Sequence, residues 1–311
     1  MINKIDFKAK NLTSNAGLFL LLENAKINGI FDLVENNLVF DNNSTNKIKM
    51  NHIKTMLCGH IIGIDKLERL KLLQNDPLVN EFDISVKQPE TVSRFLGNFT
   101  FKTTQMVRDI NFKIFKKLLK KSKLRSITID IDSSAINVEG HQEGATKGYN
   151  PKKRGNRCYN IQFAFCDELK AYVTGFMRSG NTYTANGASE MIKEIVANIK
   201  TDHLDILFRM DSGYFDEEII QTIESLNCKY LIKGKGYETL TSQVLDSKAL
   251  FVKGKEGRET IELLTKLNTW DKNRKFVVSR ILKPEKERAQ LSLFEGSEYN
   301  YFFFVTNTDL Q

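Results

Sequence analysis

The hydrophobic pattern changes its period near residue 125, and this change constrains the fold more than any other feature. Before it, apolar residues recur at helical spacing from Leu18 to Leu38 and from Ile53 to Leu73. From Ser126 the stretch SITIDIDSS alternates with period two, which puts isoleucines on one face of a strand and Asp130 and Asp132 on the other. The chain therefore begins with helices and continues into a sheet.

The order of elements after this switch indicates the fold class. SAINVE, YNIQFAF and AYVTGFM are expected to be further strands of an antiparallel meander. A helix, a strand, a helix and a strand follow in TANGASEMIKEIVANIK, LDILFRMDSG, DEEIIQTIESLN and KYLIKGKG, and a β-rich stretch comes last. We expect an α/β fold, in which a mixed sheet with flanking helices occupies residues 123–311 and carries a β-rich insertion at about 236–298. A small helical domain at 1–122 precedes it.

Length, charge and cysteine spacing narrow the class of protein. A chain of 311 residues exceeds the usual size of one core, and 41% hydrophobic with 27% charged residues excludes a disordered chain. The formal charge of +8 and the pI near 9.1 favour a polyanionic partner. The four cysteines form no C-x-x-C pair, which predicts reduced structural thiols. No segment is apolar enough for a signal core or a membrane span, so we expect a cytoplasmic protein.

Two aspartates are candidate metal ligands because each follows a run of strand-forming residues. Asp132 ends SITIDID, and Asp211 ends LDILFRMD. Carboxylates at one edge of a sheet suit Mg²⁺ or Mn²⁺, and two such ions can activate a nucleophile and stabilise a leaving oxygen in phosphoryl transfer. A single Asp at a strand end also commonly caps a turn, as Asp211 could in DSGYFDEE. The order of strands and helices around the pair is that of a ribonuclease-H-like core.

Four sequence blocks carry a family resemblance that covers almost the whole chain. They are ITIDIDSSAINVEGHQEGATKGYNPKKRGNRCYNIQFAF, FMRSGNTYTANGASEMI, RMDSGYF and YFFFVTNTDL. In this order they resemble the DDE transposases of bacterial insertion sequences, metal-dependent enzymes that cut and join DNA. The resemblance implies that Asp132 and Asp211 are the first two catalytic acids and hold Mg²⁺ or Mn²⁺. Asp130 is a further candidate carboxylate beside them.

The third acid of the family is a Glu on a helix that follows the strand matching YFFFVTN. The chain ends at Gln311, and neither Glu295 nor Glu298 matches that position because both precede the strand. Glu139 and Glu143 match no recognised role. We therefore expect a C-terminally truncated transposase. Two interpretations stay open, an active enzyme and a remnant that binds DNA without cutting it. A carbohydrate hydrolase with paired carboxylates is disfavoured by the basic charge and the single tryptophan.

Basic and polar residues in the second block suggest how DNA is held. The loop GATKGYNPKKRGNR offers cations for phosphate contact, or is simply a solvated hairpin tip. A polar turn that precedes a helix offers free backbone N–H groups as a phosphate site, or its residues only cap that helix. PETVSRFLGNF resembles half of a helix-turn-helix, so the helical domain at 1–122 is expected to bind DNA. NFKIFKKLLKKSKLR is a basic helix that suits DNA, anionic lipid or plain solvation. The resemblance implies double-stranded DNA as the partner, both as the ends of the element and as the target. It also implies a second copy of the chain when DNA is bound, and a location in the nucleoid. The DNA-binding candidates are Lys147, Lys152, Lys153, Arg154, Arg157, Arg178 and Asn181.

Overall fold

The chain forms two compact units, which are described separately. The computed structural model describes residues 12–148, 155–247, 250–284 and 298–309. The first unit is Met1–Ile114 and the second is Phe115–Gln311. The candidates Lys152, Lys153, Arg154 and Glu295 lie outside the described residues.

The first unit is helical throughout its described part. Asn42 begins the helix that follows it by accepting hydrogen bonds from the backbone N–H groups of Ser44 and Thr45, which satisfies donors that a helix start leaves free. One apolar core gathers buried side chains such as Leu22 and Leu73. The helices are α1 (Ala16–Ile27), α2 (Ile30–Asn37), α3 (Asn43–Ile61), the 3₁₀ helix η1 (Leu67–Leu73), α4 (Pro77–Glu81), α5 (Pro89–Leu96) and α6 (Phe101–Ser122), whose last turns belong to the second unit.

The second unit combines strands and helices in the order that the sequence predicts for its first half. Its elements there are β1 (Ser126–Asn137), β2 (Thr146–Lys147), β3 (Arg157–Cys166), β4 (Ala171–Ser179), α7 (Ala188–Ile199), β5 (Asp205–Met210), η2 (Ser212–Tyr214), α8 (Glu217–Ser225) and β6 (Lys229–Lys233). The second half holds α9 (Glu238–Asp246), β7 (Val252–Lys253), η3 (Lys255–Gly257), β8 (Arg258–Thr265), β9 (Arg274–Leu282) and β10 (Tyr299–Thr306).

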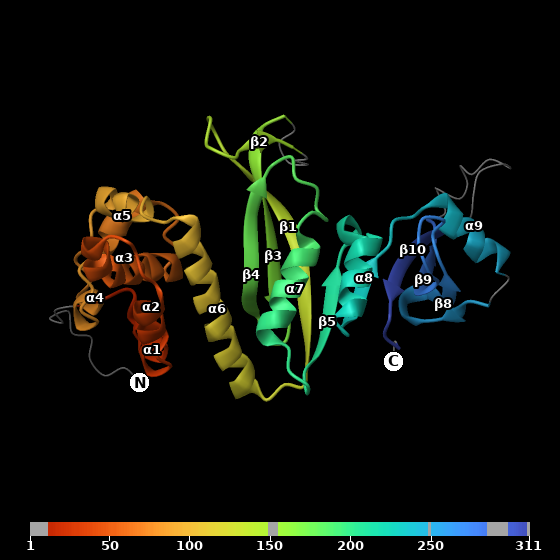
Figure 1. Ribbon diagram of the computed structural model, residues 1–311, viewed down its shortest axis with the longest axis horizontal. Coiled ribbons are helices and arrows are strands. Elements are labelled where there is room, and N and C mark those ends of the chain that lie inside the picture. The colour runs from red at the N-terminus through yellow and green to blue at the C-terminus, as the bar shows by residue number, and fades with distance from the viewer. Residues whose placement is uncertain (1–11, 149–154, 248–249, 285–297, 310–311) are drawn as a thin grey trace, which may run out of the picture. The chain divides into compact units, whose positions relative to one another are not determined.

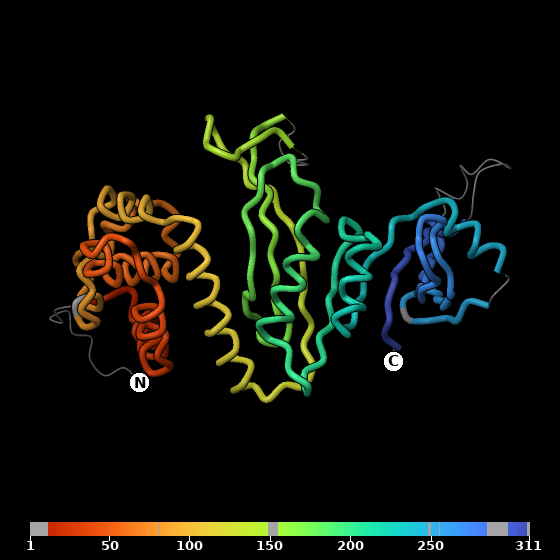
Figure 2. Tube along the Cα trace, in the orientation of Figure 1, coloured from red at the N-terminus to blue at the C-terminus, as the bar shows by residue number. Residues whose placement is uncertain are grey.

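Strand pairing in the first half gives a ribonuclease-H-like core. Strands β1, β3 and β4 form an antiparallel meander and run side by side in Figure 2. Helix α7 then leads to β5, which lies parallel to β1, and α8 leads to β6, which lies parallel to β5. The resulting order β4-β3-β1-β5-β6, with α7 and α8 beside it (Figure 1), is that of the expected fold class. The mixed α/β fold is therefore confirmed.

The sheet continues beyond β6 into the β-rich segment. Strand β10 pairs antiparallel with β6 and with β9, and β8 and β7 follow outward, so the described strands form one ten-stranded sheet. Helix α9 was not expected, because the sequence suggested only strands in this region. Its sequence ETLTSQVLD buries just Leu240 and Val244, and one such pair is too short a pattern to signal a helix.

The strand that carries Asp132 is longer than predicted. SITIDIDSS and SAINVE were expected to be separate strands, but Ser126–Asn137 is a single strand, and Asp132 lies inside it and not at its end. The physical reason is the neighbouring β3, which pairs with β1 continuously from Ile129 to Asn137 and so satisfies the backbone of the two serines. Asp132 instead marks the point where the other neighbour, β5, ends.

The cysteines meet the expectation from the sequence. The four cysteines are free and buried, as the absence of paired spacings predicted. No helix among the described residues is both long enough and apolar enough to cross a membrane.

Candidate active site

The register between β1 and β5 brings the two candidate aspartates to neighbouring positions. Ile131 is paired with Met210, and this is the last pair of the parallel ladder. Asp132 and Asp211 are the next residues on their strands. Adjacent strands lie about 4.8 Å apart, and side chains at corresponding positions of parallel strands point to the same face. The two residues therefore follow the last pair of the ladder on adjacent chain segments, where β5 ends.

Each of these carboxylates is exposed and oriented by a backbone N–H group. Asp132 Oδ1 accepts a hydrogen bond of 2.7 Å from the amide of Ser133. Asp211 Oδ1 accepts one of 2.9 Å from the amide of Gly213 and caps η2. Asp211 thus has the turn-capping contact that its sequence allowed. That contact involves Oδ1, so capping and metal binding through Oδ2 are compatible.

Asp130, the additional metal candidate, is held by an arginine. Both of its carboxylate oxygens accept hydrogen bonds from Arg209, at 2.6 and 2.8 Å. Arg209 also donates to Asp167 at 3.1 Å. The hydrogen bonds with Asp130, together with the negative charge of both carboxylates, hold the pKa of Arg209 above its ordinary value. Asp130 and Arg209 are paired in the β1–β5 register, and each lies two residues before one of the candidate aspartates. This ion pair therefore flanks the candidate site.

A buried tyrosine anchors the turn that carries Asp211. Tyr214 is fully buried, and its hydroxyl contacts Gln162 Nε2 at 3.3 Å and the side chain of Ser133. Burial raises the pKa of Tyr214 to about 12, so the hydroxyl stays protonated. These contacts tie the turn to β1 and β3. Sequence reasoning gave Tyr214 and Gln162 no role, although RMDSGYF contains the tyrosine.

Close packing also restricts the turn at Gly213. A Cβ atom there would lie 2.8 Å from Thr184 Cγ2 and 3.0 Å from Asp211 Oδ1. Only glycine leaves room for Thr184, which lies in the loop between β4 and α7. This loop therefore packs directly against the Asp211 turn.

The oxygen donors of the two aspartates fit a hard divalent cation but fill only part of its coordination shell. Asp132 and Asp211 offer exposed carboxylate oxygens, the ligand type that Mg²⁺ and Mn²⁺ prefer. Among the residues that the structure describes, no group of three or more Asp, Glu, His or Cys is placed to hold one ion. The pair can thus supply part of a coordination shell, and further oxygens have to come from water, substrate or other residues.

The predicted DNA-binding residues in the described part have different surroundings. Lys147 is exposed on β2, and Arg157, opposite it on β3, is half-buried and donates to the carbonyl of Ala145 at 3.4 Å. Asn181 is exposed and accepts from Thr146 at 3.2 Å, which places it beside β2. These three residues therefore gather at one end of the sheet, where β1 also extends past Asp132.

Arg178 contacts protein oxygens in the loop before α7. It donates to Asn160 Oδ1 at 2.6 Å, to the carbonyl of Thr184 at 3.2 Å and to the carbonyl of Asn186. Burial lowers the pKa of Arg178 from its ordinary value. In this state the guanidinium shapes the loop that packs on the Asp211 turn.

Comparisons with known proteins give a family and two structural likenesses. The family described as transposase DDE domain group 1 matches residues 3–308. The piggyBac transposase synaptic complex with hairpin DNA is similar with a TM-score of 0.42 and 10% identity, over 93% of this chain and 52% of that one. The Mos1 transposase paired-end complex with left transposon end has a TM-score of 0.25 and 9% identity, over 63% and 70%. The chain thus spans about half the length of the piggyBac chain. Among curated proteins, no sequence matched this chain.

Proposed function

Because the chain belongs to the transposase DDE domain group 1 family, we propose that it catalyses metal-dependent DNA cleavage and strand transfer at the ends of a bacterial insertion sequence. The observation that supports this most is the β1–β5 register, because Asp132 and Asp211 each directly follow one partner of its last pair, Ile131 and Met210. Two exposed carboxylates so placed can share a divalent ion, whereas carboxylates on separate sheets could not.

The proposed chemistry assigns separate tasks to the residues of the site. Asp132 and Asp211 would hold Mg²⁺ or Mn²⁺, which when bound lowers the pKa of water and stabilises a leaving oxygen. The N–H groups of Ser133 and Gly213 orient the two carboxylates. Arg209 neutralises Asp130, so that the negative potential of this face is concentrated on the two exposed acids. The chain thereby supplies positioning and charge, the usual protein contribution to phosphoryl transfer.

DNA would approach along the end of the sheet where β1 passes β2. Lys147, Arg157 and Asn181 gather there, and Lys152, Lys153 and Arg154 lie between Lys147 and Arg157 in the sequence. Cations of this kind contact phosphates and position DNA without reading its sequence. Binding two element ends at once implies two copies of the chain on DNA, which we include in the proposal.

The proposed metal site can be tested without requiring turnover. Fe²⁺ with ascorbate and peroxide produces radicals that cut a polypeptide near the bound ion. We expect cuts close to residues 132 and 211, suppressed by excess Mg²⁺ and by Asp132→Asn or Asp211→Asn. Asp205→Asn is the matched control, because Asp205 is an exposed aspartate at the opposite end of β5 that pairs with Lys229. Cuts that persist in both site variants would refute the shared site.

The reaction is tested with labelled duplexes that carry the DNA flanking the gene, together with random duplexes. Cleavage that needs Mn²⁺ or Mg²⁺ and is lost in Asp132→Asn and Asp211→Asn supports the enzyme. Metal binding and DNA binding without any cleavage would support the alternative, a DNA-binding remnant. Neutralising Lys152, Lys153 and Arg154 together should flatten the slope of log affinity against log salt by about 2 to 3. An unchanged slope would remove these residues from the proposed DNA path.

A further inference from the structure

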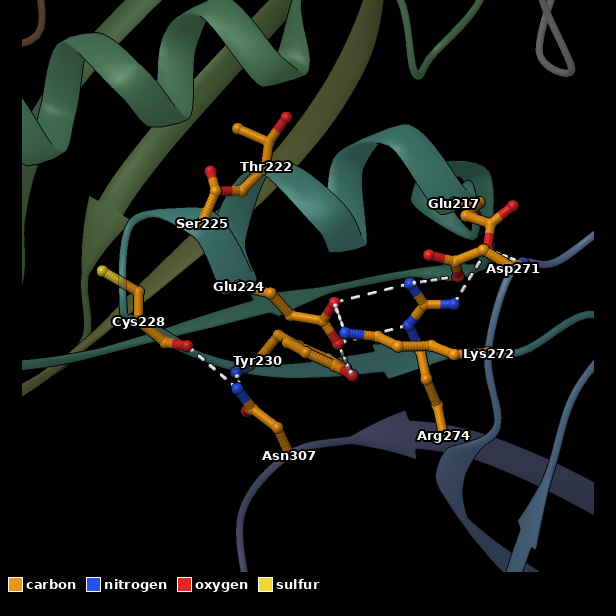
Figure 3. Close-up of polar contacts among 10 residues, drawn as sticks. All are labelled: Glu217, Thr222, Glu224, Ser225, Cys228, Tyr230, Asp271, Lys272, Arg274 and Asn307. Carbon is orange, nitrogen blue, oxygen red and sulfur yellow. Dashed lines mark hydrogen bonds and ion pairs between the residues drawn. The ribbon is translucent and has the colours of Figure 1, made fainter.

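A charged cluster around one buried arginine joins helix α8 to the beginning of β9 (Figure 3). Its centre is Arg274, whose side chain is only 2% exposed. Arg274 donates to Glu217 at 2.9 Å and to Glu224 at 3.2 Å, and it pairs with Asp271 at 3.1 Å. Glu217 is the first residue of α8, and Glu224 lies in its last turn. One guanidinium from the β-rich segment therefore holds both ends of this helix.

The Glu217 end of this cluster lies next to the Asp211 turn. Glu217 Oε1 also accepts the backbone N–H of Asp271 at 2.8 Å. Two residues earlier in the chain, the ring of Phe215 packs against Trp270, with a centroid separation of 5.2 Å. The Trp270 ring in turn lies 5.1 Å from the Arg274 guanidinium. Residues 270–274 thus contact the chain just after the turn that carries Asp211.

The two glutamates differ in how many other partners they have. Glu224 also binds Lys272 at 2.9 Å and the hydroxyl of Tyr230 at 3.0 Å. Glu217 contacts only Arg274 and Asp271 among the interactions described for it, the latter through both the backbone amide and the side chain. Loss of one contact should therefore loosen the Glu217 end more, and that end lies six residues from Asp211 by number, against thirteen for Glu224.

We propose that Trp270, Asp271 and Arg274, together with Glu217, form a clasp that positions Asp211. The β-rich segment then helps to position a residue of the candidate active site, with Arg274 as a positioning residue. The inference rests on the proposed function, because positioning matters only if Asp211 acts at the site. The physical reason is that a displacement of about 1 Å can cost on the order of 100-fold in rate. The backbone hydrogen bonds of the turn itself are long, 3.2 Å from Tyr214 N–H to Asp211 O and 3.4 Å from Phe215 N–H to Ser212 O.

Hydrogen exchange in the metal-free chain tests the clasp directly. Glu217→Gln keeps the shape of the side chain and removes its charge, so the bond with Arg274 is weakened. We expect exchange of the amides of residues 212–217 to speed up about tenfold, since Glu217 loses its charge-assisted hydrogen bond to Arg274. Glu224→Gln is the matched control, and it should speed up exchange only near the C-terminal end of α8. Equal protection of residues 212–217 in wild type and Glu217→Gln would overturn the inference.

A second measurement separates positioning from general stability. In Glu217→Gln, Fe²⁺-mediated cutting near residue 211 should fall relative to cutting near residue 132, while Glu224→Gln keeps the wild-type ratio. Arg274→Lys retains the positive charge but lacks the planar guanidinium that can bond two carboxylates at once, and it should shift the ratio in the same direction. A ratio that is unchanged in Glu217→Gln and Arg274→Lys would refute a positioning role. If wild type shows no cutting at all, the proposed function fails, and the exchange result still decides whether the clasp holds the turn.

Discussion

The two candidate aspartates are held by different means. Asp132 lies inside a twelve-residue strand, and β3 pairs with β1 on both sides of it. Asp211 stands where β5 ends, and the residues after it form a short 3₁₀ turn. Side chains anchor this turn, among them Tyr214 against Gln162 and Phe215 against Trp270. Asp132 is therefore positioned by a backbone ladder, and Asp211 by packing.

This difference determines where each position is sensitive to change. A backbone ladder tolerates most side-chain substitutions, because its hydrogen bonds are made by groups that every residue carries. A packed turn depends on the shape and charge of a few distant residues. We therefore expect substitutions far from the site to disturb Asp211 while leaving Asp132 in place.

The largest effect is expected from Arg274→Met. It leaves Glu217 and Glu224 without their shared buried partner, which should lower the free energy of unfolding by about 3–5 kcal/mol. Arg209→Met, beside Asp132, should cost less than about 1 kcal/mol because that pair is partly exposed. Urea unfolding followed by the fluorescence of Trp270, the single tryptophan, reports on this unit. Equal losses of unfolding free energy in the two variants would contradict the contrast between the two aspartates.

Next in size is the effect of Gly213→Ala. The added methyl would meet Thr184 Cγ2 at 2.8 Å, and overpacking of this kind costs about 1–3 kcal/mol. Adding Thr184→Ser removes that methyl and should recover part of the loss. Gly236→Ala serves as control, since nothing lies within 4 Å of its built Cβ. If Thr184→Ser gives no recovery, the clash is not with Thr184.

A smaller difference is expected between the aspartates themselves. Asp211→Ala removes the cap of η2 and should cost about 1 kcal/mol. Asp132→Ala changes an exposed strand residue and should stay within about 0.5 kcal/mol of wild type. Thermal unfolding of both variants at equal ionic strength measures the difference. A greater loss for Asp132→Ala would mean that side-chain contacts, and not the ladder, hold β1.

The sequence predicted the features that depend on local pattern. The alternation around Ile129 predicted the exposed face that carries Asp132, and the helix–strand order predicted β5 and its aspartate. The full length of β1 was missed because it depends on pairing with β3. The clasp was missed because Arg274 bonds to residues 50 and 57 positions away, and no periodicity reports such contacts. The catalytic roles of Asp132 and Asp211 stay predictions.

The smallest effect concerns pH and Glu224, which binds Arg274 at the other end of α8. Burial alone would raise the pKa of Glu224, but hydrogen bonds from Lys272 and Arg274 and their charges bring it below its ordinary value of 4.5. A carboxyl whose pKa is lower in the folded state binds a proton more readily when unfolded, so its stabilising contribution is present above about pH 4.5. That contribution is lost as the pH falls through the folded pKa. Glu224→Gln should therefore be less stable than wild type at pH 7, and the difference in unfolding free energy should shrink on acidification below pH 4.5. Urea unfolding of both proteins between pH 3 and 7 measures this difference, and a constant gap would show that Glu224 is held by its shape and not by its charge.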